Sequence, residues 1–391
     1  MKNEIALYVH IPFCIHECGY CAFAKVEDND FYKADRIHFI QKLLEELQFR
    51  VNNFDRDVLF KTLYIGGGTP SILTVNEIQM LIKGIKSICG DNFKEITVDC
   101  NPEHMDALEK IDAFNDLGVN RLSMGVQTLS DKGLTVLERQ VNKDKLEKVT
   151  ELLPNKFLGQ LSYDLILAWP GQTVKDFERD DIPFLRTKQY DHLSLYLLNY
   201  EPGTRLLRDV EKGRVTPCHE EDAADIWEAC LECTESVGLE QYEISSFCKN
   251  KAYGYHNIHT WKNLEYLGVG PGAVSRIGNK RWTNTKVIKK YMEQTSIGEA
   301  VVQDTELITT EVAWKDAFIF GMRYKEGVNL KELNKLYGID FASILKTSID
   351  QGVKSNHLVI DGEQIKFTQE GWSYFDSYIS TWMLNIEEGV E

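Results

Sequence analysis

The chain carries the stretch Tyr8-Val9-His10-Ile11-Pro12-Phe13-Cys14-Ile15-His16-Glu17-Cys18-Gly19-Tyr20-Cys21-Ala22-Phe23. Three cysteines in the spacing C-x3-C-x2-C follow an apolar run, Ala6 to Ile11, that reads as a strand. Thiolates this close together are typical of a metal site. Iron–sulfur clusters and structural zinc sites are normally held by four protein ligands. A loop with three cysteines therefore leaves one metal position for a ligand that is not protein.

These cysteines also allow two simpler interpretations. Zinc could take the three thiolates together with His16 or His10, but closed zinc sites usually show two separated ligand pairs. A disulfide framework fits less well, because nine cysteines in a chain without a secretory segment suggest a reducing compartment. An iron–sulfur cluster is the favoured reading, and zinc stays the minor alternative.

The composition is that of an ordinary soluble globular protein. The 391 residues are 43% hydrophobic and 27% charged, and they suffice for one large domain plus a smaller one. A net charge of -16 disfavours nucleic acid as a partner. Apolar runs fall far short of the roughly 18 residues that a membrane span needs, and no signal-peptide pattern is present. These features predict a cytoplasmic location.

Strand-like and helix-like segments alternate over about the first 245 residues. Strands are expected at Ala6 to Ile11, Leu63 to Ile65, Glu95 to Cys100, Arg121 to Val126, Leu161 to Leu167, His192 to Leu197 and Gln241 to Ser245. Helices are expected at Val75 to Ile88, Asp106 to Leu117, Lys143 to Leu153, Val174 to Arg186 and Glu220 to Val237, and on a face formed by Ile37, Ile40, Leu44 and Leu47. Six repeated strand–helix units favour a parallel sheet covered by helices. Periodicity alone does not separate an open sheet from a barrel.

The cysteine stretch resembles the radical S-adenosylmethionine (SAM) superfamily, in the HemN/HemW branch of oxygen-independent coproporphyrinogen III oxidases and heme chaperones. In that superfamily three cysteines hold a 4Fe-4S cluster, and the amino and carboxylate groups of SAM chelate the fourth iron. The resemblance implies a partial, six-unit TIM-like (β/α) barrel. In barrels of this kind the chemistry gathers at the carboxyl ends of the strands.

The resemblance also implies which residues form the site. Cys14, Cys18 and Cys21 are the expected cluster ligands. The expected SAM-binding residues are Tyr8, Gly67, Gly68, Thr69, Asp99, Gln127, Arg139, Asp164 and Ile166. Asp99 stands where the family normally has Glu, one methylene longer. Taken singly, each of these residues could equally belong to a tight turn or be a polar group exposed to solvent. The sequence assigns no catalytic residue.

A further segment bears on heme. His256-Asn257-Ile258-His259-Thr260-Trp261 resembles the H-N-x-x-Y-W signature of HemW-type proteins, with Thr260 in place of Tyr. Imidazole is a common axial ligand of heme iron, so His256 is a candidate heme ligand. A histidine–asparagine pair can equally cap a loop by hydrogen bonding. The C-x-x-C pair Cys230 and Cys233 lies in a helix-like run and reads as buried core.

Position 23 separates the two branches. The oxidases have a fourth cysteine there, and this chain has Phe23. The favoured function is therefore a heme chaperone that binds a 4Fe-4S cluster, SAM and heme as cargo, and that delivers heme to membrane-bound respiratory enzymes. The alternative is an oxidase that decarboxylates coproporphyrinogen III in porphyrin biosynthesis. Val141, Ala168 and Trp169 depart from the family pattern, and whether the chain is an enzyme or forms a homodimer is left open.

The predicted domain organisation has three parts. Residues 1–245 form the barrel, residues 246–300 an extension and connector, and residues 301–391 a C-terminal helical, winged-helix-like domain. In the last part, helices are expected at Thr310 to Tyr324, Leu330 to Tyr337 and Phe341 to Gln351, followed by a hairpin from Leu358 to Phe367 around an Asp-Gly turn and a last helix. Because this part is not strongly basic, a lid or packing role is expected rather than DNA binding.

Overall fold

The computed structural model of the protein describes residues 3–294 and 301–389. Six parallel strands form the centre of a 12-stranded sheet: β1 (Asn3–Ile11), β4 (Val58–Gly67), β5 (Glu95–Cys100), β6 (Arg121–Gln127), β7 (Gln160–Leu167) and β8 (His192–Leu197). They are neighbours in chain order, which is the order of a (β/α) barrel. The six-unit core predicted from the sequence is confirmed.

Both edges of this core are extended by further strands. β11 (Tyr266–Val269) pairs in parallel with β1, and β12 (Val274–Ile277), β13 (Lys280–Asn284) and β14 (Val302–Leu307) continue outward in antiparallel pairing. At the other edge β8 pairs with β10 (Ser246–Cys248), which pairs with β9 (Glu240–Glu243). The strand predicted at Gln241 to Ser245 is therefore one arm of a short hairpin.

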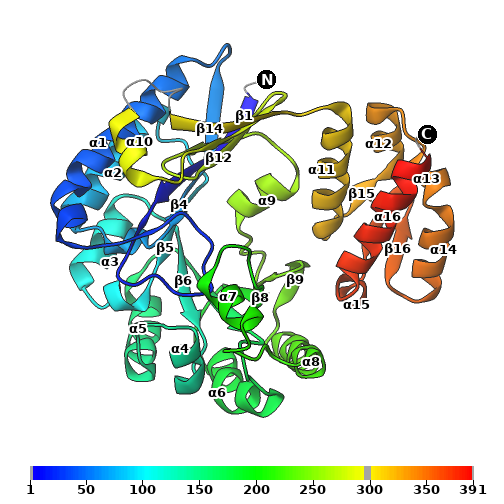
Figure 1. Ribbon diagram of the computed structural model, residues 1–391, viewed down its shortest axis with the longest axis horizontal. Coiled ribbons are helices and arrows are strands. Elements are labelled where there is room, and N and C mark those ends of the chain that lie inside the picture. Colours follow the sequence, from blue (N-terminus) through cyan, green and yellow to red (C-terminus); the bar gives the residue numbers. More distant parts are fainter. Residues whose placement is uncertain (1–2, 295–300, 390–391) are drawn as a thin grey trace.

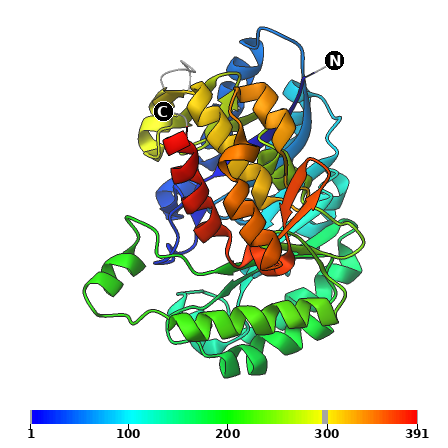
Figure 2. The ribbon, with the colours of Figure 1, turned by 90° about the vertical axis from the view of Figure 1, so that its right-hand side faces the viewer.

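The helices that follow the strands cover the outside of the sheet (Figure 1). They are α1 (Asp30–Asn52), α2 (Val75–Cys89), α3 (Leu108–Asp116), α4 (Asp131–Val136), α5 (Lys143–Lys156), α6 (Val174–Thr187) and α8 (Glu220–Ser236). The short helix α7 (Arg205–Glu211) has no buried residue and stands away from the sheet (Figure 2). Cys230 and Cys233 are buried on α8, as predicted.

The buried face of α1 differs from the predicted one. Ile37 is exposed, and the helix packs through Phe39, Ile40, Leu43 and Leu47. Those four positions recur with the 3.6-residue period of one helix face, and Ile37 lies off that face. The apolar face predicted from the sequence is therefore shifted by about one residue from the face that is buried.

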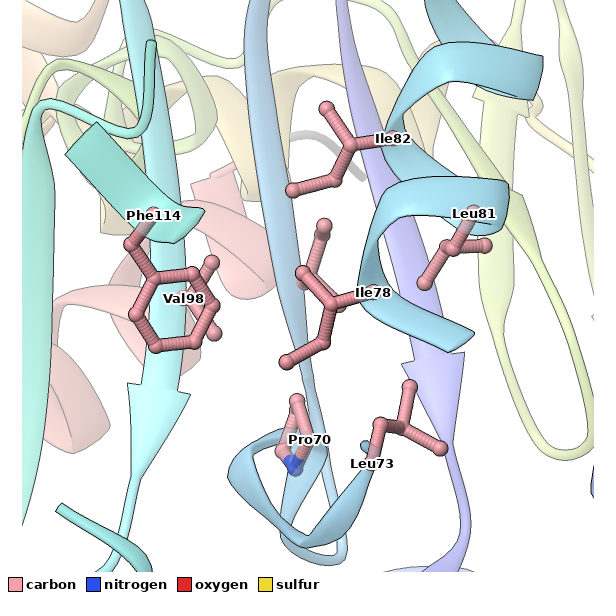
Figure 3. A pocket seen from close by; sticks show the side chains of 8 residues that line it. Pro70, Leu73, Ile78, Leu81, Ile82, Val98 and Phe114 are labelled. Carbon is pink, nitrogen blue, oxygen red and sulfur yellow. The ribbon is translucent and has the colours of Figure 1, made fainter. Parts of the chain in front are cut away.

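Helix α2 is an example of the close packing of the helices against the sheet. Its start is fixed by a capping box between Thr74 and Glu77. Figure 3 shows side chains of α2 facing Val98 of β5 and Phe114 of α3. The space left between these side chains is about 10 Å³, at the lower limit for one water molecule. This gap is packed core rather than a ligand site.

The C-terminal part builds a second hydrophobic core around Trp314, Phe318, Phe341 and Trp382. Its elements are α11 (Thr310–Arg323), α12 (Leu330–Tyr337), α13 (Phe341–Ile344), α14 (Lys346–Lys354), α15 (Gln369–Trp372), α16 (Phe375–Gly389) and a sheet in the order β15 (Val328–Asn329), β17 (Gln364–Phe367), β16 (Leu358–Asp361). The predicted hairpin is β16 and β17. The single helix predicted over Phe341 to Gln351 is wrong, because it is broken at the buried Leu345, whose backbone sits at φ -90°, ψ 0°.

The second core is attached beside α9 (Tyr255–Trp261), as Figures 1 and 2 show. The Arg323 guanidinium is 3.0 Å from the buried Glu243 carboxylate, and the Lys325 N–H donates to the Tyr242 carbonyl at 3.0 Å. Strand β14 belongs to the barrel sheet although its residues fall in the range predicted for the C-terminal domain. The three-part division by residue range stays a prediction. None of the described helices has the length and apolar character needed to cross a membrane.

Candidate functional site

A pocket of about 540 Å³ opens at the carboxyl ends of the parallel strands. Its lining comes from the cysteine loop and from the segments that follow β4, β5, β6, β7 and β8. The structure brings together in it the following predicted site residues: Cys14, Cys18, Cys21, Gly67, Gly68, Thr69, Asp99, Gln127, Arg139, Asp164 and Ile166. These residues lie far apart in the sequence, and the barrel fold brings them together in one pocket.

The cysteine loop is closed by short strand pairing. β2 (Phe13–Cys14) pairs with β3 (Val26–Glu27), and the Asp28 N–H donates to the Cys14 carbonyl at 2.8 Å. The Cys14 thiol is buried under the Thr69 hydroxyl, 3.7 Å away. This pairing holds the whole loop over the pocket.

The pKa values of two of the cluster-loop thiols, Cys14 and Cys18, lie above the ordinary value of a cysteine. Burial raises the pKa of Cys14 to about 11, against the lowering effect of the Thr69 hydroxyl. Burial also raises the pKa of Cys18, which the nearby Arg139 opposes. In residues 3–294 and 301–389 no three His, Cys, Asp or Glu side chains stand ready at metal-binding spacing. A metal would therefore draw the three thiols together, and it would work against the raised pKa values of Cys14 and Cys18. The donor set, three thiols facing one pocket, fits a cluster.

The glycine turn after β4 allows the cysteine loop to lie close to the sheet. The Gly68 N–H donates to the Ile11 carbonyl at 2.8 Å, and a Cβ on Gly68 would lie 2.7 Å from the Pro12 carbonyl carbon. Gly67 has φ +115°, a conformation that side chains rarely adopt. Both glycines are therefore needed for the approach of two backbones at the pocket wall.

Two carboxyl groups form the floor of the pocket. The Tyr64 hydroxyl donates to Asp99 Oδ1 at 2.5 Å, and the Ser123 hydroxyl lies 3.0 Å from Asp164 Oδ2. Burial, opposed by the hydrogen bond from the Tyr64 hydroxyl and reinforced by the neighbouring Asp164, raises the pKa of Asp99 to about 7. Burial raises the pKa of Asp164 as well. Such a floor can accept hydrogen bonds from ligand hydroxyls.

The segment after β6 carries the remaining polar groups. Gln127 has the strained φ of +68°, and Arg139 Nη2 donates to the Gly125 carbonyl at 3.2 Å. Glu138, also at positive φ (+54°), turns its carboxylate to the cysteine loop and accepts from the Gly19 N–H at 3.1 Å. Glu138 and Tyr64 were missed from the sequence. Glu138 directly precedes the Arg of the family motif, but nothing in the sequence shows that it reaches the loop.

Tyr8 and His256 lie outside the pocket lining. The Tyr8 hydroxyl contacts His10 Nδ1 at 3.0 Å. His256 is 8% exposed, its Nδ1 is 2.9 Å from the Thr62 hydroxyl, and its backbone N–H donates to Glu95. Burial lowers the pKa of His256 to about 3, so the imidazole is neutral. It packs against Tyr64, one layer behind the pocket wall.

Comparison with known proteins assigns this chain to a family. Residues 8–180 match the model of the Radical SAM superfamily, and residues 308–374 match the HemN C-terminal domain. Heme chaperone HemW of Bacillus subtilis (strain 168) is 33% identical over 89% of this chain and 92% of its own length. The chain belongs to the HemN/HemW family. Other relatives in this family are heme chaperone HemW of Lactococcus lactis, 29% identical over 98% of this chain and 99% of its own, and a mitochondrial radical SAM domain-containing protein 1 of Danio rerio, 28% identical over 98% and 88%.

A solved structure confirms the fold of the HemN/HemW family. Coproporphyrinogen III oxidase (HemN) from Escherichia coli superimposes with a TM-score of 0.82 over 97% of this chain and 90% of its own, at 20% identity. Membership of the radical SAM superfamily implies a 4Fe-4S cluster and SAM. The pocket offers thiols for the first and carboxyl, amide and guanidinium groups for the second.

Proposed function

We propose that the protein is a heme chaperone that binds a 4Fe-4S cluster, SAM and heme and passes the heme to respiratory enzymes. One observation carries the choice within the family. Phe23, at the position where the oxidases have a fourth cysteine, lies at the pocket mouth with 65% of its surface exposed. A large apolar side chain at that place suits an apolar cargo and supplies no further thiol. The HemW-named relatives support the same choice.

The roles proposed for the pocket residues are those that the family resemblance implies, and the chemistry of the side chains supports them. Cys14, Cys18 and Cys21 would hold the cluster, which supplies an open iron for the amino and carboxylate groups of SAM. The Asp99 carboxylate accepts hydrogen bonds from the ribose hydroxyls. Arg139 pairs with the SAM carboxylate, because a guanidinium binds such groups by two parallel hydrogen bonds.

The remaining SAM contacts are made by the pocket walls. Gly67, Gly68 and Thr69 line the amino end of SAM, and Gln127 and Asp164 contact it from the ends of β6 and β7. The backbone of Ile166 lies along the adenine. Tyr8 acts from behind this wall, through its contact with His10.

The second candidate is the oxidase. It is favoured by the enclosed polar floor of Tyr64, Asp99 and Asp164, since an enzyme that generates a radical must exclude water from its substrate. In that reaction SAM is reductively cleaved to a 5'-deoxyadenosyl radical, and coproporphyrinogen III is oxidatively decarboxylated.

One experiment separates the two candidates. The anaerobically reconstituted full chain is titrated with ferric heme, and in parallel it is incubated with coproporphyrinogen III, SAM and a reductant. We expect heme to bind at one per chain and the porphyrinogen to stay unconverted, with the Cys14→Ala protein as the background control. Conversion of the porphyrinogen together with stoichiometric consumption of SAM would make the protein an oxidase.

A further inference from the structure

We infer that a second pocket, at the opposite end of the barrel from the cysteine loop, binds a small oxyanion through Lys188 and Lys249. The pocket has a volume of about 310 Å³ and lies at the amino ends of β7 and β8. The cluster pocket opens at the carboxyl ends of the strands, and the two pockets share no lining residue among those that the structure describes. The inference is therefore independent of the proposed function.

The walls of this second pocket are part of the fold. The Asp191 carboxylate accepts from the Leu161 N–H at 2.9 Å, and the Asp191 carbonyl accepts from the Lys249 N–H at 2.9 Å. These bonds join the start of β7, the turn before β8 and the residue after β10. Phe157, Leu161 and Tyr190 line the pocket and are each at most 5% exposed. The cavity is therefore present before any ligand binds, and its volume lies in the range of small-molecule sites, about 300 to 1,000 Å³.

Lys249 brings a positive charge to the pocket. Its Nζ lies 4.3 Å from the centre of the Tyr190 ring, which is a cation–π contact. Burial lowers the pKa of Lys249, and the negative charge of Asp191 opposes this effect. Within residues 3–294 and 301–389 no acidic side chain forms an ion pair with Lys249. A half-buried ammonium group without a counter-ion is stabilised when an anion binds next to it.

Lys188 brings a second ammonium group to the same pocket. Its side chain is 17% exposed, and its Nζ is 2.9 Å from the Glu151 carboxylate of α5. The Glu151 side chain is 70% exposed, so it approaches Lys188 from the solvent and does not line the pocket. An ion pair with a partner this exposed contributes little to stability. An anion in the pocket can therefore replace Glu151 at small cost.

The charges of the lining favour an anion as the ligand. Among the described residues that line this pocket, the charged ones are Lys188, Lys249 and Asp191. The Asp191 carboxylate is already engaged by the Leu161 N–H, so the two ammonium groups are the charges left for a ligand. This local excess of positive charge is opposite in sign to the net charge of the chain, -16. Lysine binds carboxylates and phosphates in proteins, and the small volume favours a compact molecule that carries one or two such groups.

The test uses inorganic phosphate and malonate as probes, titrated into the full chain by isothermal calorimetry. We expect saturable binding of one probe per chain, and we expect Lys249→Met and Lys188→Met each to weaken it at least about tenfold. Methionine keeps a long apolar side chain and removes the charge. Tighter binding of phosphate would assign the site to phosphorylated ligands, and tighter binding of malonate would assign it to carboxylates.

The matched control is Lys94→Met. Lys94 Nζ also lies over a tyrosine ring, 3.2 Å from the centre of Tyr255, but Lys94 does not line the pocket. This control is expected to bind both probes as the parent protein does.

A second measurement needs no variant and so does not depend on whether the variants fold. The parent protein is acetylated briefly with acetic anhydride, with and without a saturating probe, and each lysine is followed by peptide mass spectrometry. We expect the probe to slow the labelling of Lys188 and Lys249 and to leave that of Lys94 unchanged. Absence of saturable binding by both probes at millimolar concentration, equal affinity in Lys249→Met and Lys94→Met, or unprotected Lys249 would each overturn the inference.

Discussion

Substituting Gly68 by alanine tests whether the cysteine loop must lie directly on the sheet. The added Cβ would lie 2.7 Å from the Pro12 carbonyl carbon and 2.8 Å from the carbonyl oxygens of Pro12 and Phe13. All three atoms are backbone, so the overlap can be relieved only by moving the peptide that leads into Cys14. Overpacking of this kind costs about 1 to 3 kcal/mol.

The structure predicts which property of the protein this free-energy cost changes. The loop is the part that can move, so we expect Gly68→Ala to fold but to bind SAM about 5- to 150-fold more weakly, the equivalent of 1 to 3 kcal/mol. Its cluster iron should also fall. The assay is iron and sulfide analysis of the anaerobic protein together with calorimetric titration of SAM. Thermal unfolding reports whether the fold itself is affected.

A matched control is Gly84→Ala on α2. Its Cβ would also meet an atom at short distance, 2.5 Å, but that atom is the end of the flexible Leu44 side chain. Alanine also favours a helix interior over glycine by about 1 kcal/mol, which offsets the crowding. The control should keep its iron and its SAM affinity. Full iron content and unchanged SAM affinity in Gly68→Ala would refute the reasoning.

Two further predictions concern the same pocket. Replacing Cys14, Cys18 or Cys21 by alanine should each abolish binding of about four irons per chain, whereas Cys89→Ala on α2 should not, and full iron in the three single variants would exclude the cluster. The affinity for SAM should rise with pH through about 7, the pKa of Asp99, because only the ionised carboxylate accepts from both ribose hydroxyls. Asp99→Asn should flatten this dependence relative to the parent when SAM affinity is measured from about pH 6 to about pH 8, and equal slopes would show that Asp99 does not contact the ribose.

The part of the site that was predictable from the sequence is the part that lies on strand ends. Asp99, Gln127 and Asp164 each follow a run whose apolar pattern marks a buried strand, and parallel strands bring their carboxyl ends to one edge. Their meeting in one pocket therefore follows from the strand pattern together with the barrel fold.

The contacts that the sequence did not reveal come from loops and from side chains that cross between elements. Glu138 reaches His16 and Gly19 because its backbone adopts a positive φ, which the residue type does not signal. His256 stood out as a histidine in a family motif. Its burial depends on Thr62 and Glu95, which come from two strands more than a hundred residues earlier in the chain. Long-range packing of this kind has no local sequence pattern.

The place of β1 in the sheet has a consequence for biosynthesis. The strand that leads into the cysteines lies between β4 and β11, and β11 is residues 266–269. At ribosomal speeds of about 5 to 20 residues per second, β11 follows β1 by roughly 10 to 50 seconds. Throughout that interval one edge of β1 has no partner strand, and the cysteine loop follows directly from that unpaired strand. The strand that carries the cysteine loop is therefore among the first to be made, but its place in the sheet is completed only after residue 269.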